Sequence, residues 1–68
     1  DDLLIDLRTE AAPIAGARYV PPERIAHLDP GAAARVVLAC RTGLRAHHAG
    51  RTLRATWPGP IALLALND

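Results

Sequence analysis

The only cysteine in the sequence, Cys40, has neighbours of the types that activate a thiol. Arg41 and Arg45 bring two permanent positive charges close to it, and Gly43 lies between them. Nearby cations favour the thiolate, which is the nucleophilic form of cysteine. Glycine adopts backbone conformations that curl a loop until its N–H groups converge on an anion. The spacing therefore predicts a nucleophilic cysteine beside an anion-binding loop.

A simpler interpretation is that Cys40 is a small apolar side chain at the end of a buried strand, because free cysteine is commonly buried and inert. A structural turn has no need of two arginines around a glycine, so the pattern favours a chemical role. The predicted loop could hold the terminal sulfur anion of a persulfide, or the thiosulfate dianion. A redox-sensing role is less well supported, because the sequence has no second cysteine to resolve an oxidised thiol.

Three apolar runs have the length of buried strands, at residues 3–7, 35–39 and 61–66. They do not alternate with polar residues, which favours a parallel sheet covered on both faces. Residues 44–56 are predicted to form a helix that ends before Pro58, with a narrow buried face. That face comprises Ala46, Ala49, Gly50, Leu53 and Trp57. Cys40 would then lie where a central strand leads into a helix, the end of an open α/β sheet at which ligands bind.

The segment between the first two strands is rich in turn-forming residues. Pro13, Gly16 and Pro21 predict a loop over residues 8–20, and residues 23–28 are expected to form a short helix. Residues 29–31, Asp-Pro-Gly, predict a turn. The resulting order of strands and helices is typical of an α/β fold, an open parallel β-sheet flanked by helices.

Three segments resemble, in the right order, motifs of the single-domain rhodaneses. Residues 40–45 resemble the active-site loop Cys-Arg-x-Gly-x-Arg, residues 4–8 the aliphatic-Asp-Val-Arg strand, and residues 14–21 the Ile-Pro-Gly-Ala…Ile-Pro segment. Pro13 stands where this family often has His, and Ala15 where it usually has Pro. The resemblance implies a rhodanese-like sheet, truncated at both ends. The family's opening strand and helix are missing before Leu3, and its closing Gly-Gly…Trp segment is missing after Leu66.

The resemblance also implies an activity, that of a thiosulfate sulfurtransferase. Cys40 would take the outer sulfur of thiosulfate as a persulfide and pass it to cyanide, a thiol or a protein cysteine. The substrate-binding residues would be Arg41, Thr42, Gly43, Leu44 and Arg45, whose backbone N–H groups would surround the sulfur. Arg45 and Arg41 would bind the anionic donor, and no metal or organic cofactor is required. The alternative is a catalytically inactive rhodanese fold that serves as a protein-interaction module, although such modules typically replace the cysteine.

Loop length distinguishes this pattern from that of the cysteine phosphatases, some of which are relatives of the rhodanese fold. Their motif is His-Cys-x5-Arg, whereas here Ala39 precedes the cysteine and the arginine follows as Cys-x4-Arg. Ala46 occupies the position of the phosphatase arginine. The loop is of the length that suits sulfur.

Composition limits the possible partners. The net charge is +1 and no basic stripe is present, which argues against nucleic-acid binding. No apolar run approaches the roughly 18 residues of a membrane span, and a single reduced cysteine fits a cytoplasmic location. Fourteen of the 68 residues are alanine and none is Phe or Met, so the core available to residues 1–68 as one domain is thin. We therefore expect the domain to be incomplete, or to be part of a larger or multi-domain protein.

Several residues that attract attention are better explained by structure. His47 and His48 are adjacent on the predicted helix and point about 100° apart, so they are not expected to share a metal ion. Asp6 and Arg8 are expected to form a structural pair, because a preformed thiolate needs no general base. Trp57 is expected to anchor its helix in the core.

Overall fold

The computed structural model describes residues 1–8 and 14–66. These residues form a parallel sheet of four strands with helices packed against it. The elements are β1 (Asp2–Asp6), β2 (Arg18–Tyr19), the 3₁₀ helix η1 (Pro22–His27), β3 (Arg35–Cys40), α1 (Leu44–Arg54) and β4 (Ile61–Ala65). The strand order is β2-β1-β3-β4, and each neighbouring pair is parallel. This arrangement confirms the predicted α/β class with an open parallel sheet.

Parallel pairing brings the carboxyl ends of the central strands together at one edge of the sheet. Asp6 of β1 pairs with Ala39, and Cys40 pairs with Ala65 of β4. The peptide that follows β1 extends this ladder, because the N–H of Leu7 donates to the carbonyl of Ala39 at 2.9 Å. The end of β3 is therefore supported from both sides where it leads into α1.

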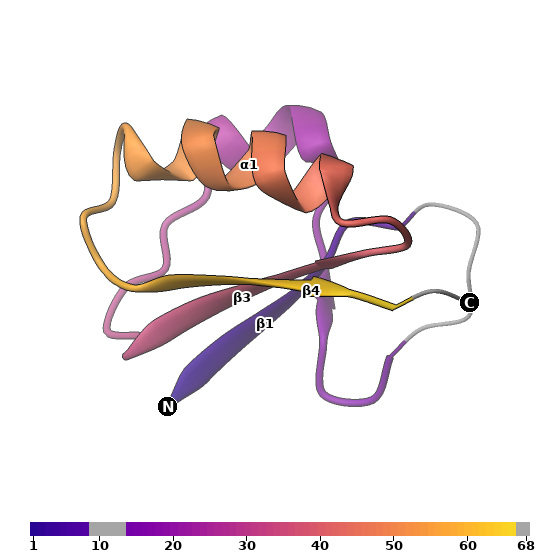
Figure 1. Ribbon diagram of the computed structural model, residues 1–68. Helices are drawn as coiled ribbons and strands as arrows, with labels where there is room; N and C mark the ends of the chain where they lie inside the picture. Colours follow the sequence, from indigo (N-terminus) through magenta and orange to yellow (C-terminus); the bar gives the residue numbers. More distant parts are fainter. Residues whose placement is uncertain (9–13, 67–68) are drawn as a thin grey trace.

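Both helices cover the same face of the sheet, with α1 lying over β3 and β4 and η1 beside it (Figure 1). The core between these layers consists mainly of fully buried aliphatic side chains, namely Ile5, Leu7, Ile25, Val36, Leu38 and Leu53. Ala46 and Ala49 of α1 are also buried, and their small side chains let the helix lie close to the sheet. Trp57 is half-buried and packs against this core.

The opposite face of the sheet differs from the expectation that both faces would be covered. Side chains alternate across a strand, and Leu38 and Leu63 lie beside Gly50 of α1, so their neighbours in sequence face away from the helices. Among these neighbours Val37 is only half-buried and Leu64 remains 42% exposed. Within the described residues, the helices therefore cover one face of a two-layer domain.

Some predicted boundaries were wrong. The predicted loop over residues 8–20 contains β2, whose pairing with β1 continues as the N–H of Val20 donates to the carbonyl of Asp6 at 3.1 Å. The last helix ends at Arg54, where the N–H groups of Ala55 and Thr56 bond only three residues back, to the carbonyls of Thr52 and Leu53, and close a tighter turn.

Other local predictions agree with the structure. The short helix is the 3₁₀ helix η1, with Ile25 buried. The predicted turn contains Gly31 at a φ of 61°, with its N–H bonded to the Asp29 carboxylate. Pro13, Asn67 and Asp68 lie outside the described residues. Across residues 1–8 and 14–66, no helix is long and apolar enough to cross a bilayer.

Candidate active site

Cys40 is the last residue of β3, and only three residues separate it from the start of α1. Its position at the carboxyl end of a central strand agrees with the prediction. The residue is only 1% exposed, so its sulfur lies beneath the loop and is not presented on the surface. A reagent must therefore displace neighbouring atoms to reach the thiol.

Two backbone N–H groups converge on the sulfur. The N–H of Gly43 donates to Cys40 Sγ at 3.0 Å, and the N–H of Ala46 donates to the same atom at 3.3 Å. Hydrogen bonds of this kind become stronger when the acceptor carries a charge. The loop is therefore built to stabilise a negatively charged sulfur.

The Ala46 bond also satisfies a need of the helix. The first N–H groups of an α-helix have no partner within it, and the side chain before the helix usually accepts one of them. The residue in that position is Gly43, which has no side chain to accept such a bond. Cys40 Sγ takes this place, and it does so at the positive end of the helix dipole.

Gly43 sets the shape of the loop through its backbone. Its φ of 86° and ψ of −16° lie in the left-handed region, which residues with a side chain rarely adopt. This conformation lets the chain reverse after β3, so that the carbonyl of Gly43 accepts from the N–H of His47 while its own N–H faces Sγ. The backbone geometry thus favours glycine at this position.

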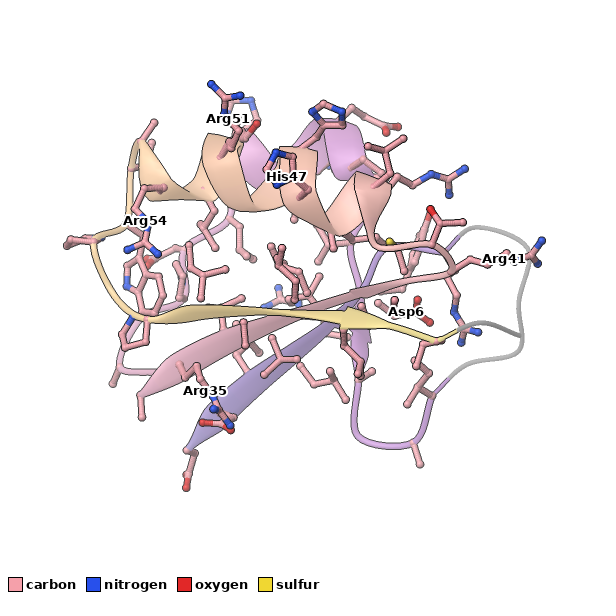
Figure 2. All side chains as sticks on the ribbon, in the orientation of Figure 1. Asp6, Arg35, Arg41, His47, Arg51 and Arg54 are labelled. Carbon is pink, nitrogen blue, oxygen red and sulfur yellow. The ribbon has the colours of Figure 1, made fainter. Side chains whose placement is uncertain are left out.

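The side chains of the loop are arranged around its outside. Arg41, Thr42, Leu44 and Arg45 are all exposed. Figure 2 shows Arg41 pointing outward from the loop, away from the sheet and α1. Leu44 is 63% exposed, although it lies in the same loop as the buried thiol. The loop therefore presents an apolar side chain and two cations at its surface.

A buried ion pair supports the neighbouring strand. Asp6 lies at the carboxyl end of β1, and its Oδ1 accepts from the backbone N–H of Arg8 at 2.9 Å and from Nε at 3.1 Å. Its Oδ2 accepts from Arg8 Nη2 at 3.3 Å. Burial acts to raise the pKa of Asp6, but the hydrogen bonds and charge of Arg8 outweigh it and hold that pKa below its usual value. The pair fixes the chain as it leaves β1, in agreement with the structural role predicted for it.

The histidines do not gather at the site. The rings of His47 and His48 lie edge to face with centroids 5.7 Å apart, and both residues are exposed on α1. Among the described residues there is no group of three or more His, Cys, Asp or Glu side chains that could hold a metal ion.

The sequence analysis identified the right loop but missed one of the two N–H groups that donate to the sulfur. It limited the N–H groups around the sulfur to residues 41–45, whereas Ala46 supplies one of the two. Thr42 Oγ1 accepts the N–H of Leu44 at 3.4 Å, so that group bonds to a side chain instead of the sulfur. The position of Ala46 as the third residue of the helix was the signal, because side chains that cap a helix accept from that residue.

Comparison with known proteins identifies one similar structure. No protein-family model matches the sequence, and no curated protein matches it significantly. The crystal structure of a rhodanese homolog from the extremely thermophilic bacterium Thermus thermophilus is similar to it, with a TM-score of 0.70 and 26% sequence identity. The match covers 93% of this chain and 74% of that one.

Proposed function

The chain is a rhodanese-like domain, and we propose that it is a sulfurtransferase that carries sulfane sulfur as a persulfide on Cys40. The observation that carries this proposal is the pair of N–H groups directed at Cys40 Sγ. A cysteine that served only to fill space would not need two donors at its sulfur. Such donors can stabilise the negative charge that the sulfur carries during the proposed reaction.

In the proposed reaction, the Cys40 thiolate attacks the outer sulfur of thiosulfate. A new S–S bond forms, and the S–S bond of thiosulfate breaks, so that sulfite leaves with the electron pair. The negative charge then resides on the terminal sulfur of the Cys40 persulfide. An acceptor such as cyanide attacks that sulfur, leaves as thiocyanate and restores the Cys40 thiolate.

The residues around Cys40 supply binding and charge stabilisation in this scheme. The donors at Gly43 and Ala46 bind the sulfur anion, and the start of α1 adds a favourable dipole. Arg45 on the first turn of α1 attracts the dianionic donor, with Arg41 contributing positive charge from the other end of the loop. Thr42 and Leu44 complete the loop that encloses the sulfur. No step requires a metal ion or an organic cofactor.

Mass spectrometry tests the proposal directly. After incubation with thiosulfate and removal of excess reagent, digestion with trypsin without reductant should release residues 36–41 as one peptide, since Arg35 and Arg41 flank it. We expect the mass of this peptide to increase by one sulfur atom, and cyanide treatment to reverse the increase with release of thiocyanate.

A matched variant distinguishes the proposal from its alternative. Cys40→Ser should keep the fold and form no adduct, because a hydroxyl cannot carry sulfane sulfur. If the folded parent protein also acquires no sulfur from thiosulfate or from a persulfide donor, the proposal is wrong. An inactive rhodanese fold that acts as a protein-interaction module would then be the better account.

A further inference from the structure

The residue that follows β1 is bonded to the peptide that carries the thiol. The N–H of Leu7 donates to the carbonyl of Ala39 at 2.9 Å, and this carbonyl belongs to the same peptide unit as the N–H of Cys40. The side chain of Leu7 is fully buried and belongs to the same apolar cluster as Cys40. The backbone and the side chain of Leu7 therefore both constrain the position of Cys40.

The Asp6 carboxylate closes a turn around Leu7. Its Oδ1 accepts the N–H of Arg8 at 2.9 Å, which is the bond that an aspartate commonly makes to the backbone two residues further on. The carbonyl of Asp6 is also fixed, because it accepts the N–H of Val20 at 3.1 Å. Leu7 is thus held between a residue bonded to β2 and an N–H bonded to the carboxylate.

The Arg8 side chain orients that carboxylate. Its Nε donates to Asp6 Oδ1 at 3.1 Å, and its Nη2 donates to Oδ2 at 3.3 Å. The two side chains are only 9% and 6% exposed, so water competes little with these bonds. The guanidinium group therefore keeps Oδ1 aligned with the backbone N–H of Arg8.

The ion pair and the sulfur lie on opposite faces of the sheet. Leu38 lies beside Gly50 of α1, and side chains alternate along a strand, so Cys40 faces the helix as well. Asp6 is in register with Ala39, which faces the other way. Figure 2 shows Asp6 at the same end of the sheet as the loop that carries Arg41. The pair can therefore act on the thiol only through the backbone that separates them.

We propose that Asp6 and Arg8 are a positioning pair for the Cys40 thiol. The bond between Asp6 Oδ1 and the N–H of Arg8 fixes the turn, and the turn fixes the peptide before Cys40. The sulfur is thereby held where the two N–H groups of its loop converge. This inference rests on the proposed function, and it goes beyond a structural role because it makes the rate of sulfur loading depend on a single oxygen atom.

Two substitutions separate positioning from stability. Asp6→Ala removes both the charge and the acceptor for the N–H of Arg8. Asp6→Asn removes the charge but keeps an oxygen atom, which the surrounding donors of Arg8 orient toward that N–H. Both variants lose the same charge interaction with Arg8, so their melting temperatures should fall by similar amounts. Only Asp6→Ala should lose the positioning of the turn.

Single-turnover loading from saturating thiosulfate, well below the melting temperatures, tests the proposal. We expect Asp6→Ala to load sulfur about tenfold more slowly than the parent protein, because a small displacement of a reacting atom is costly. Asp6→Asn should restore most of the rate without restoring the stability. The matched control is Val36→Ala, which creates space in the core near the start of β3. It should lower the melting temperature and leave the loading rate close to the parental one.

Amide hydrogen exchange tests the same positioning without sulfur chemistry. At one temperature, the N–H groups of Gly43 and Ala46 should exchange faster in Asp6→Ala than in Val36→Ala, because only the first variant releases the sulfur that they bond to. If Asp6→Ala does not fold, Asp6→Glu takes its place. It keeps the charge but displaces the oxygen atoms by one methylene group, so the same slow loading and fast exchange are expected.

Each measurement has a result that would overturn the proposal. Equal loading rates in Asp6→Ala and Asp6→Asn would show that the pair acts through stability alone. A parental rate in Asp6→Ala would remove the pair from the reaction. If the parent protein itself acquires no sulfur, the proposed function fails and hydrogen exchange alone decides this inference. Equal exchange of the Gly43 and Ala46 amides in Asp6→Ala and Val36→Ala would then show that the pair does not position the thiol.

Discussion

Replacing Gly43 by alanine separates the strain of the loop from its chemistry. Gly43 has a φ of 86°, and a Cβ placed there would lie 3.6 Å from the Cβ of Ala65, which is ordinary contact. No clash is therefore expected, and the effect comes from the left-handed backbone alone. Holding a residue with a side chain in that region costs about 1–2 kcal/mol. In a domain of this size, each kcal/mol lowers the melting temperature by about 4–8 °C.

Part of this strain can be relieved if the backbone of residue 43 rotates, but rotation turns its N–H away from Cys40 Sγ. A hydrogen bond to a charged group contributes about 1.5–3 kcal/mol. Loss of this bond in the thiolate and in the transition state should slow persulfide formation about tenfold to a hundredfold. We therefore expect Gly43→Ala to lower both stability and the rate of sulfur loading.

The matched control is Gly16→Ala. Gly16 has a φ of 80°, and a Cβ placed there meets nothing within 4 Å, so this variant has a similar backbone cost at a residue outside the thiol loop. Thermal unfolding should show comparable losses in both variants, while single-turnover loading from thiosulfate should slow only in Gly43→Ala. If both variants load sulfur at the parental rate, the N–H of Gly43 does not stabilise the reacting sulfur.

Three further outcomes follow from the site. Arg45→Ala should lower kcat/KM for thiosulfate about fivefold, as expected for the loss of one exposed charge. Arg45→Lys should rescue the activity only in part, because lysine lacks the planar guanidinium group. Steady-state kinetics that show no change would exclude Arg45 from donor binding. The pKa of Asp6 is held low in the folded state, so its contribution to stability is present above the unfolded value and is lost as the pH falls through the folded one. Asp6→Asn should therefore lower the free energy of unfolding by about 3 kcal/mol at pH 7. In urea unfolding experiments, the free energy of unfolding of this variant should fall less steeply at acid pH than that of the parent protein. An unchanged dependence on acid pH would show that the ion pair is unimportant. Because Cys40 is 1% exposed, iodoacetamide should alkylate it much faster than a dye-sized maleimide, and equal rates would show that the loop opens freely.

The main strands and α1 were predictable because local sequence determines them. The three apolar runs correspond to β1, β3 and β4 within one residue at each end. Arg18 and Tyr19 of β2 gave no such signal, since both are exposed and the neighbouring residues favour a loop. Their strand conformation depends on hydrogen bonds to β1, and pairing between distant segments cannot be inferred from local pattern.

In the candidate site, too, the features set by local sequence were predictable and those set by the folded backbone were not. The order of Cys40, Gly43 and Arg45 identified the loop and placed it between β3 and α1. The pattern could not say which N–H groups face the sulfur, because that depends on the left-handed turn at Gly43 and on where α1 begins. It linked burial of Cys40 to an inert structural role, whereas in the structure the buried sulfur accepts two N–H groups.

One sulfur atom serves both the fold and the proposed chemistry of this domain. With glycine at the position before α1, the helix has no side chain of its own to accept the N–H of Ala46, and Cys40 Sγ does so. The N–H of Ala46 would lack a partner at the positive end of the helix dipole without this cap. The same N–H and the same dipole stabilise a sulfur anion. Formation of a persulfide leaves the inner sulfur attached to Cys40 and moves the charge one atom outward. The N–H groups of Gly43 and Ala46 can then bond to the charged outer sulfur only if the loop changes its conformation. Formation of the persulfide must therefore alter the stability of the first turn of α1.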